Sequence, residues 1–157
     1  MRQVERYRPI DAQNVPPETR LAGEDMLGYV RRDLQLDQLT LKWFSASDRQ
    51  LTQEELLGPD GVTLLNLNGG VTCSILGRVS EDVPTLIWCR ADLTPHMAAR
   101  VVAHEARHAW QILQEQAGAV PRRLDSGEKD ARAYTRSRIP TARELVRQRL
   151  EEKQSGA

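Results

Sequence analysis

The sequence predicts a single α+β domain in which a small antiparallel sheet packs against helices. Residues 17–36 and 95–116 carry apolar residues at the three- and four-residue spacing of amphipathic helices. Between these segments, short apolar runs are separated by turn residues, as is typical of strands. Two more helical segments follow, one over about 125–138 and one over about 141–152. A chain of 157 residues is long enough to bury one hydrophobic core.

The first helix is expected to follow an irregular N-terminal arm. Residues 1–16 are polar and contain prolines, which interrupt regular structure. In the helix expected over 17–36, apolar side chains fall near one stripe and the opposite face is charged. The stripe consists of Leu21, Leu27, Val30 and Leu34. We therefore expect the domain itself to span 17–153, with a frayed tail over 154–157.

The middle of the chain is expected to form an antiparallel meander. Runs rich in strand-forming residues occur at 39–44, 62–67, 71–76 and 85–90. The sequence Asn68-Gly69-Gly70, between the second and third runs, is a hairpin signal. The last strand leads directly into the helix expected over 95–116.

The two cysteines lie symmetrically about one of the expected turns. Cys73 and Cys89 are equally distant from residue 81, so in a symmetric hairpin they would be cross-strand neighbours. Such a pair could serve redox chemistry or bind a metal, but it lacks the C-x-x-C spacing. Cysteine often packs as a small buried hydrophobe. We therefore interpret both as reduced core residues, which fits a reducing compartment.

The composition disfavours several classes of partner. The chain has 22 basic and 22 acidic residues, so no nucleic-acid or anionic membrane surface is predicted. No apolar run approaches the roughly 20 residues that a membrane span needs. The N-terminus lacks the apolar region of a signal peptide. These features predict a soluble cytoplasmic protein.

The helix expected over 95–116 contains the most informative motif, His104-Glu105-Ala106-Arg107-His108, which has the form H-E-x-x-H. Thr94 is suited to the N-cap, Pro95 to the first helical position, and Gly118 to the position that ends the helix. Residues four apart share a helix face, so both imidazoles can approach one zinc ion at about 2.0–2.1 Å. The glutamate beside the first ligand can take a proton from water. The alternative is a core helix whose two histidines are satisfied by hydrogen bonds.

A catalytic zinc usually has three protein ligands and an open position, so a third ligand is expected from another element. His96 lies eight residues before His104, about 12 Å away along the helix axis, and is too far. Gln114 stands where the long metzincin motif would need a histidine. The acidic candidates are Asp125, Glu128 and Asp130. Glu128 is preferred because the next helix can fold back onto the first. Asp130 is the reserve, and Glu128 as a helix-start carboxylate is the alternative.

Residues 101–110, together with Glu128-Lys129-Asp130-Ala131, resemble the gluzincin metallopeptidases, which belong to the zincins. That family combines H-E-x-x-H with a glutamate in E-x-x-A or E-x-x-D on a later helix. The resemblance is specific over about 86–135, and the sequence is close to small single-domain forms, which include minigluzincins and short metallopeptidases of bacterial and phage genomes.

The resemblance implies a zincin-like minimal fold, one Zn²⁺ per chain held by His104, His108 and Glu128, and Glu105 as the catalytic base. It also implies that the strand at 85–90 forms the sheet edge that borders the cleft, where an extended peptide can add by strand pairing. Tyr134 would be the counterpart of the family's oxyanion-stabilising tyrosine or histidine. However, it lies six residues after Glu128, on another helix face, and packing is the preferred interpretation.

The leading hypothesis is therefore a zinc-dependent metallopeptidase that hydrolyses peptide or protein substrates, with Glu105 as general base. The alternative is a catalytically silent zinc-binding module on a zincin scaffold, which serves regulation or interaction. A complete H-E-x-x-H favours the enzyme, because a pure binding module does not need Glu105. A third hypothesis is a domain without metal.

Overall fold

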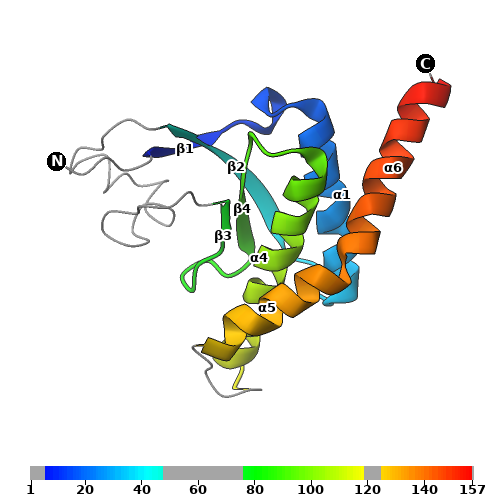
Figure 1. Ribbon diagram of the computed structural model, residues 1–157. Coiled ribbons are helices and arrows are strands. Elements are labelled where there is room, and N and C mark those ends of the chain that lie inside the picture. Colours follow the sequence, from blue (N-terminus) through cyan, green and yellow to red (C-terminus); the bar gives the residue numbers. More distant parts are fainter. Residues whose placement is uncertain (1–5, 48–75, 119–124, 157) are drawn as a thin grey trace.

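The computed structural model describes residues 6–47, 76–118 and 125–156 (Figure 1). The elements follow the order β1 (Arg6–Ile10), a 3-10 turn (Ala12–Asn14), α1 (Pro17–Asp33), β2 (Thr40–Ser47), β3 (Gly77–Arg78), β4 (Leu86–Arg90), α4 (Pro95–Gln116), α5 (Asp125–Ser137) and α6 (Ile139–Gly156). The hairpin expected over 62–67 and 71–76 lies outside the described residues. None of the helices in the described ranges combines the length and apolar character needed to cross a bilayer.

The α+β class is confirmed, but the sheet is mixed instead of antiparallel. Its four strands have the order β1-β2-β4-β3. β1 and β3 are antiparallel to their neighbours, whereas the central strands β2 and β4 run parallel, with Thr40 opposite Leu86. Parallel neighbours need a long connection. The segment between Ser47 and Leu86 supplies this connection. The sequence pattern predicts that each strand pairs with the next one in a hairpin, so it does not predict the parallel pairing of β2 and β4.

Two further expectations about the sheet are wrong. Residues 6–10 are not an irregular arm: they form β1, which pairs with β2 from Arg6 opposite Ser47 to Ile10 opposite Trp43. Pro9 is tolerated there because β1 is an edge strand, where a missing N–H need not break the ladder. The strand at 85–90 is not an edge, because β4 lies between β2 and β3. Among the strands of the described residues, the edge on that side is β3.

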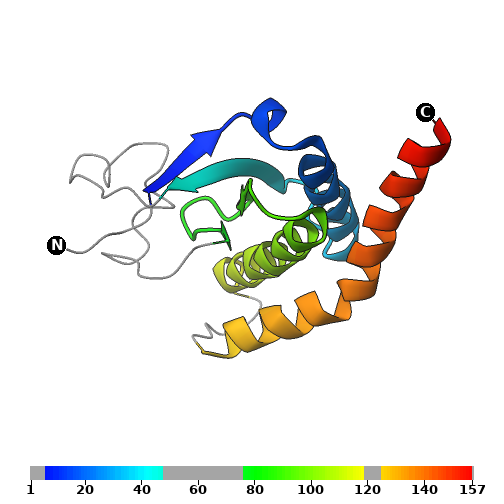
Figure 2. The same ribbon diagram turned by 45° about the horizontal axis from the view of Figure 1, so that its top comes forward.

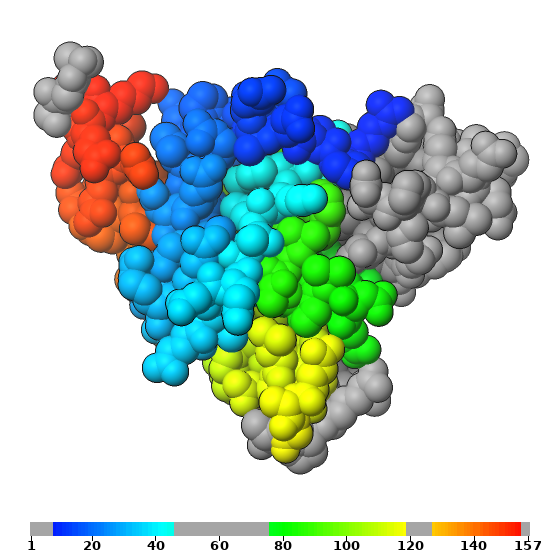
Figure 3. All heavy atoms as spheres, turned by 180° about the vertical axis from the view of Figure 1, so that it is seen from behind, coloured from blue at the N-terminus to red at the C-terminus, as the bar shows by residue number. Residues whose placement is uncertain are grey.

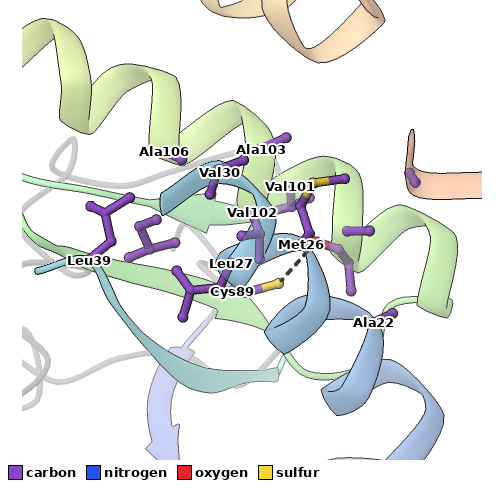
Figure 4. Close-up of a cluster of buried hydrophobic side chains, with 14 of the residues drawn as sticks. Ala22, Met26, Leu27, Val30, Leu39, Cys89, Val101, Val102, Ala103 and Ala106 are labelled. Atoms are coloured by element: carbon purple, nitrogen blue, oxygen red, sulfur yellow. Dashed lines mark hydrogen bonds between the residues drawn. The ribbon is translucent and has the colours of Figure 1, made fainter. Parts of the chain in front are cut away.

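The helices expected over 17–36 and 95–116 are confirmed as α1 and α4, which pack side by side against the sheet (Figures 1 and 2). The bounds of α4 match the prediction because its start is strongly encoded. Thr94 caps it by accepting a hydrogen bond from the Met97 N–H at 3.3 Å. The core between these elements joins aliphatic residues, such as Met26 and Val30 of α1 and Val102 of α4, to the buried Trp43 of β2 (Figure 4).

Cys89 belongs to this core (Figure 4). It is a free, fully buried cysteine, as expected, and burial holds the pKa of its thiol well above the ordinary value. The register places Gly77 opposite Cys89, so Cys73 is not its cross-strand neighbour. Cys73 itself lies outside the described residues.

α5 packs against α4, and α6 continues along the outer side of α1 (Figures 1 and 3). The last helix is expected to begin at about residue 141, after Pro140, but α6 already begins at Ile139. Pro140 lies in the first turn of α6, where a backbone N–H would have no partner within the helix, so its absence costs no hydrogen bond. The helix also continues to Gly156, past the expected end near 152. Two exposed ion pairs, Arg149–Asp25 and Lys153–Glu18, connect α6 to α1.

Gly23 and Gly28 of α1 provide a matched test of this packing. A Cβ at Gly23 would lie 2.7 Å from Cη2 of the Trp43 ring, which is only 2% exposed, whereas at Gly28 only Arg32 lies within 4 Å. Gly23→Ala should therefore lower the free energy of unfolding by about 1–3 kcal/mol. Gly28→Ala should raise it by about 0.5–1 kcal/mol through helix propensity. Urea unfolding followed by circular dichroism measures both. Equal stabilisation by the two variants would contradict the close packing of α1 on Trp43.

Candidate metal centre

Three side chains from two helices meet beside the middle of α4. His104 and His108 project from successive turns of α4, and Glu128 projects from the beginning of α5. The two Nε2 atoms lie 3.2 Å apart. Each lies 3.1 Å from one Glu128 oxygen, Oε1 for His104 and Oε2 for His108. The three residues expected as ligands therefore form one group that could hold a metal ion.

Hydrogen bonding assigns the tautomer of His104. Its Nδ1 lies 3.2 Å from the Thr135 hydroxyl oxygen, and that hydroxyl donates its own hydrogen to the Ala131 carbonyl at 2.7 Å. The hydroxyl oxygen must therefore accept from Nδ1–H of His104. Burial, together with the neighbouring His108, lowers the pKa of His104, so the ring is neutral near pH 7. The lone pair of Nε2 then faces the site.

The same reasoning applies to His108 through Gln111. The amide nitrogen of Gln111 donates to the Gly127 carbonyl and to Asp130 Oδ2, both at 2.8 Å. Its oxygen must therefore accept the 2.9 Å hydrogen bond from Nδ1–H of His108. In this tautomer of the neutral ring, the lone pair of His108 is on Nε2.

The resulting arrangement fits a cation. Two imidazole nitrogens and two carboxylate oxygens face one point, and each can supply a lone pair to a cation. Ligand atoms at 2.0–2.1 Å around a tetrahedral ion would be about 3.3–3.4 Å apart. The observed separations of 3.1–3.2 Å are close to this value. Metal-binding histidines also usually donate their other N–H to a protein acceptor, as both do here.

The reserve ligand Asp130 has a different role. Its carboxylate is held by the Arg107 guanidinium at 2.7 and 3.2 Å, besides accepting from Gln111. Arg107 also stacks over the Trp110 ring at 3.9 Å. Asp130 is therefore directed away from the metal group and positions Gln111. For Asp125, the structure describes the backbone at the start of α5 but not the side chain.

Glu105 lies against the edge strand β3. Its side chain is 8% exposed, and burial raises its pKa to about 7. Gly77 makes the approach of β3 possible, because a Cβ there would lie 2.4 Å from Val101 Cγ1 and 3.0 Å from Glu105 Cγ. Among the described residues, no group donates a hydrogen bond to the Glu105 carboxylate. It is therefore available to a water molecule or a substrate.

A cleft of about 330 Å³ opens at this point. It lies between β3, α4 and α5, and His104 and Glu105 both line it. The other lining residues are Leu76, Gly77, Met97, Arg100, Val101 and Thr135. The cleft therefore combines one ligand of the metal group, the buried acid and an apolar wall.

Tyr134 does not belong to this cleft. It is buried, and its hydroxyl donates to Asp33 of α1 at 2.7 Å. Arg138 also binds Asp33, and its guanidinium lies over the Tyr134 ring. The preferred interpretation, that Tyr134 packs the fold, is confirmed.

Sequence reasoning missed Thr135 and Gln111, the two acceptors that orient the imidazoles. Both leave a weak signal. Gln111 stands three residues after His108, and Thr135 seven residues after Glu128, so each shares a face with a ligand. Comparison of the chain with protein-family models, with curated proteins and with solved structures found no match.

Thr135→Val tests the orientation of His104. It keeps the side-chain shape and removes the acceptor of Nδ1–H, so zinc affinity should fall about 10- to 100-fold. Thr40→Val, on an exposed strand position, is the control. Zinc affinities are measured by competition with a fluorescent chelator. Unchanged affinity in Thr135→Val, with the fold intact by circular dichroism, would contradict the assigned role.

Proposed function

We propose that this protein is a zinc-dependent peptidase, in which one zinc ion is held by His104, His108 and Glu128 and Glu105 acts as general base. The observation that carries the proposal is the convergence of lone pairs from these three ligands beside a buried carboxylate in a cleft. A set of two imidazoles and one carboxylate is typical of catalytic zinc, with a position left for water.

Bound there, zinc would supply the Lewis acidity that lowers the pKa of water toward about 7 and polarises a carbonyl. The chain's own residues supply the remaining functions. Glu105 accepts the proton of the attacking water on its carboxylate and later donates it to the leaving amine. Thr135 and Gln111 keep the two imidazoles directed at the site.

The edge of the sheet offers a place for the substrate backbone. In the part of the chain that the structure describes, β3 is the outermost strand beside the cleft, and Leu76 and Gly77 line the cleft. An extended peptide can pair with such an edge through main-chain hydrogen bonds. This assigns to β3 the role that the sequence assigned to the strand at 85–90.

A catalytically silent zinc-binding module would use the same ligands. Burial of an acid disfavours its charged form and is therefore costly. A module that only binds zinc gains nothing from a buried carboxylate in the lining of the cleft. The position of Glu105 therefore supports the enzyme over the module.

Metal content tests the ligand set. Protein purified without added metal should contain about one zinc per chain by elemental mass spectrometry, because three ligands converge. His104→Ala and Glu128→Ala should lose it, whereas Asp130→Ala should retain zinc with reduced affinity. If zinc is retained in Glu128→Ala but lost in Asp130→Ala, the third ligand is Asp130 and the assignment of Glu128 is wrong. No zinc in the wild type, even after incubation with the ion, would refute the proposal.

Turnover tests the base. Glu105→Gln should lower peptide hydrolysis by at least about 10²- to 10⁴-fold while zinc remains bound, because the amide cannot accept the proton. Glu115→Gln on the same helix is the control for charge removal. Cleavage of a fluorogenic peptide library measures the rates. Full activity in Glu105→Gln would exclude this mechanism, and no cleavage by the zinc-loaded wild type would favour the silent module.

A further inference from the structure

We propose that Arg100 forms a carboxylate-binding subsite in the cleft, so that the substrate carries a carboxylate close to the scissile bond. This inference names the substrate class of the site proposed above and rests on that proposal.

The subsite continues the row of ligands along α4. Arg100 precedes His104 by four residues and His96 precedes Arg100 by four, so all three occupy the same ridge of the helix. Successive members are about 6 Å apart along the axis. Arg100 lines the cleft together with His104 and Glu105, so a ligand that reaches the metal group also reaches the guanidinium.

Arg100 and His96 have unmet hydrogen-bonding capacity. Within the described ranges of the chain, the buried Nε of Arg100 and the buried Nε2 of His96 have no hydrogen-bond partner. Buried polar atoms are nearly always paired, so the orphaned Nε–H of Arg100, a residue that lines the cleft, indicates an absent partner. Arg107, also on α4, is by contrast held by both oxygens of Asp130.

Arg100 carries its positive charge one helical turn from His96. Burial lowers the pKa of His96, and the charges of Arg100 and Arg143 lower it further. In the described part of the chain, neither Arg100 nor Arg143 forms an ion pair with an acid. An anion is therefore the complementary ligand, and a planar guanidinium binds a carboxylate through two parallel hydrogen bonds.

The rest of the cleft defines the shape of that ligand. Leu76, Met97 and Val101 form an apolar wall next to Arg100. A peptide spans at most about 3.3–3.6 Å per residue, so a group about 6 Å from His104 along the axis faces a position one or two residues from the scissile bond. The expected substrate therefore has a carboxylate at that position and an apolar side chain on the same or the neighbouring residue. The carboxylate belongs either to the free C-terminus or to an acidic side chain.

Binding to the zinc-loaded Glu105→Gln variant tests the subsite without turnover. Three probes of equal length are compared by calorimetry: an N-acetylated tripeptide ending in leucine as the free acid, its C-terminal amide, and an amide with aspartate in place of the last leucine. The carboxylate should improve affinity about 10- to 100-fold over the plain amide, as expected for charge-assisted hydrogen bonds. The probe that gains identifies the source of the carboxylate.

Arg100→Ala in this background should abolish the gain, and Arg100→Lys should retain part of it. Arg32→Ala, an exposed arginine of α1, is the control and should leave the gain unchanged. Zinc content and circular dichroism verify that each variant is folded and loaded. Equal affinities for all three probes, or a gain that survives Arg100→Ala, would overturn the subsite.

Cleavage of the same probes by the wild type separates this inference from the proposed function. Cleavage without preference for a carboxylate overturns the subsite alone. A gain in binding that depends on Arg100, without any cleavage by the wild type, supports the subsite and overturns the peptidase.

Discussion

The hydrogen bonds of Gln111 join α4 to α5, and the candidate metal centre depends on that junction. The Gln111 amide binds His108 on its own helix and both Gly127 and Asp130 on the other, while Arg107 fixes Asp130. These contacts set the distance between the helices and so carry Glu128 to the two imidazoles. Thr135 closes the arrangement from α5 by binding His104. The ligands are therefore positioned by a network whose members have no other evident role.

The sheet contributes a second constraint at the opposite side of α4. Gly77 allows β3 to lie directly against Val101 and Glu105, which buries the acid and leaves the cleft between strand and helix. A side chain at this position would push β3 outward and expose Glu105. The candidate site thus depends on two close contacts of a single helix, one with α5 and one with β3.

The features that depend on neighbouring residues in the chain, such as the start of a helix and the residues on one of its faces, could be predicted from the sequence. Thr94 and Pro95 define where α4 begins, and the spacing of His104 and His108 places both imidazoles on one face. The order of the strands was not predictable in this way, because β2 and β4 pair across a long connection and β3 has only two residues. Pro9 suggested a loop, although an edge strand accommodates it. Thr135 and Gln111 could be recognised only after α5 was docked on α4, because a polar residue near a ligand has many possible partners.

The central claim is that two imidazoles and one carboxylate converge as ligands of a single cation. X-ray absorption spectroscopy at the zinc edge of the zinc-loaded protein tests it most directly. The account predicts four nitrogen or oxygen neighbours at about 2.0–2.1 Å, with the multiple-scattering signature of two imidazoles and no sulfur. A sulfur neighbour at about 2.3 Å, or a shell of oxygens without imidazole, would contradict it.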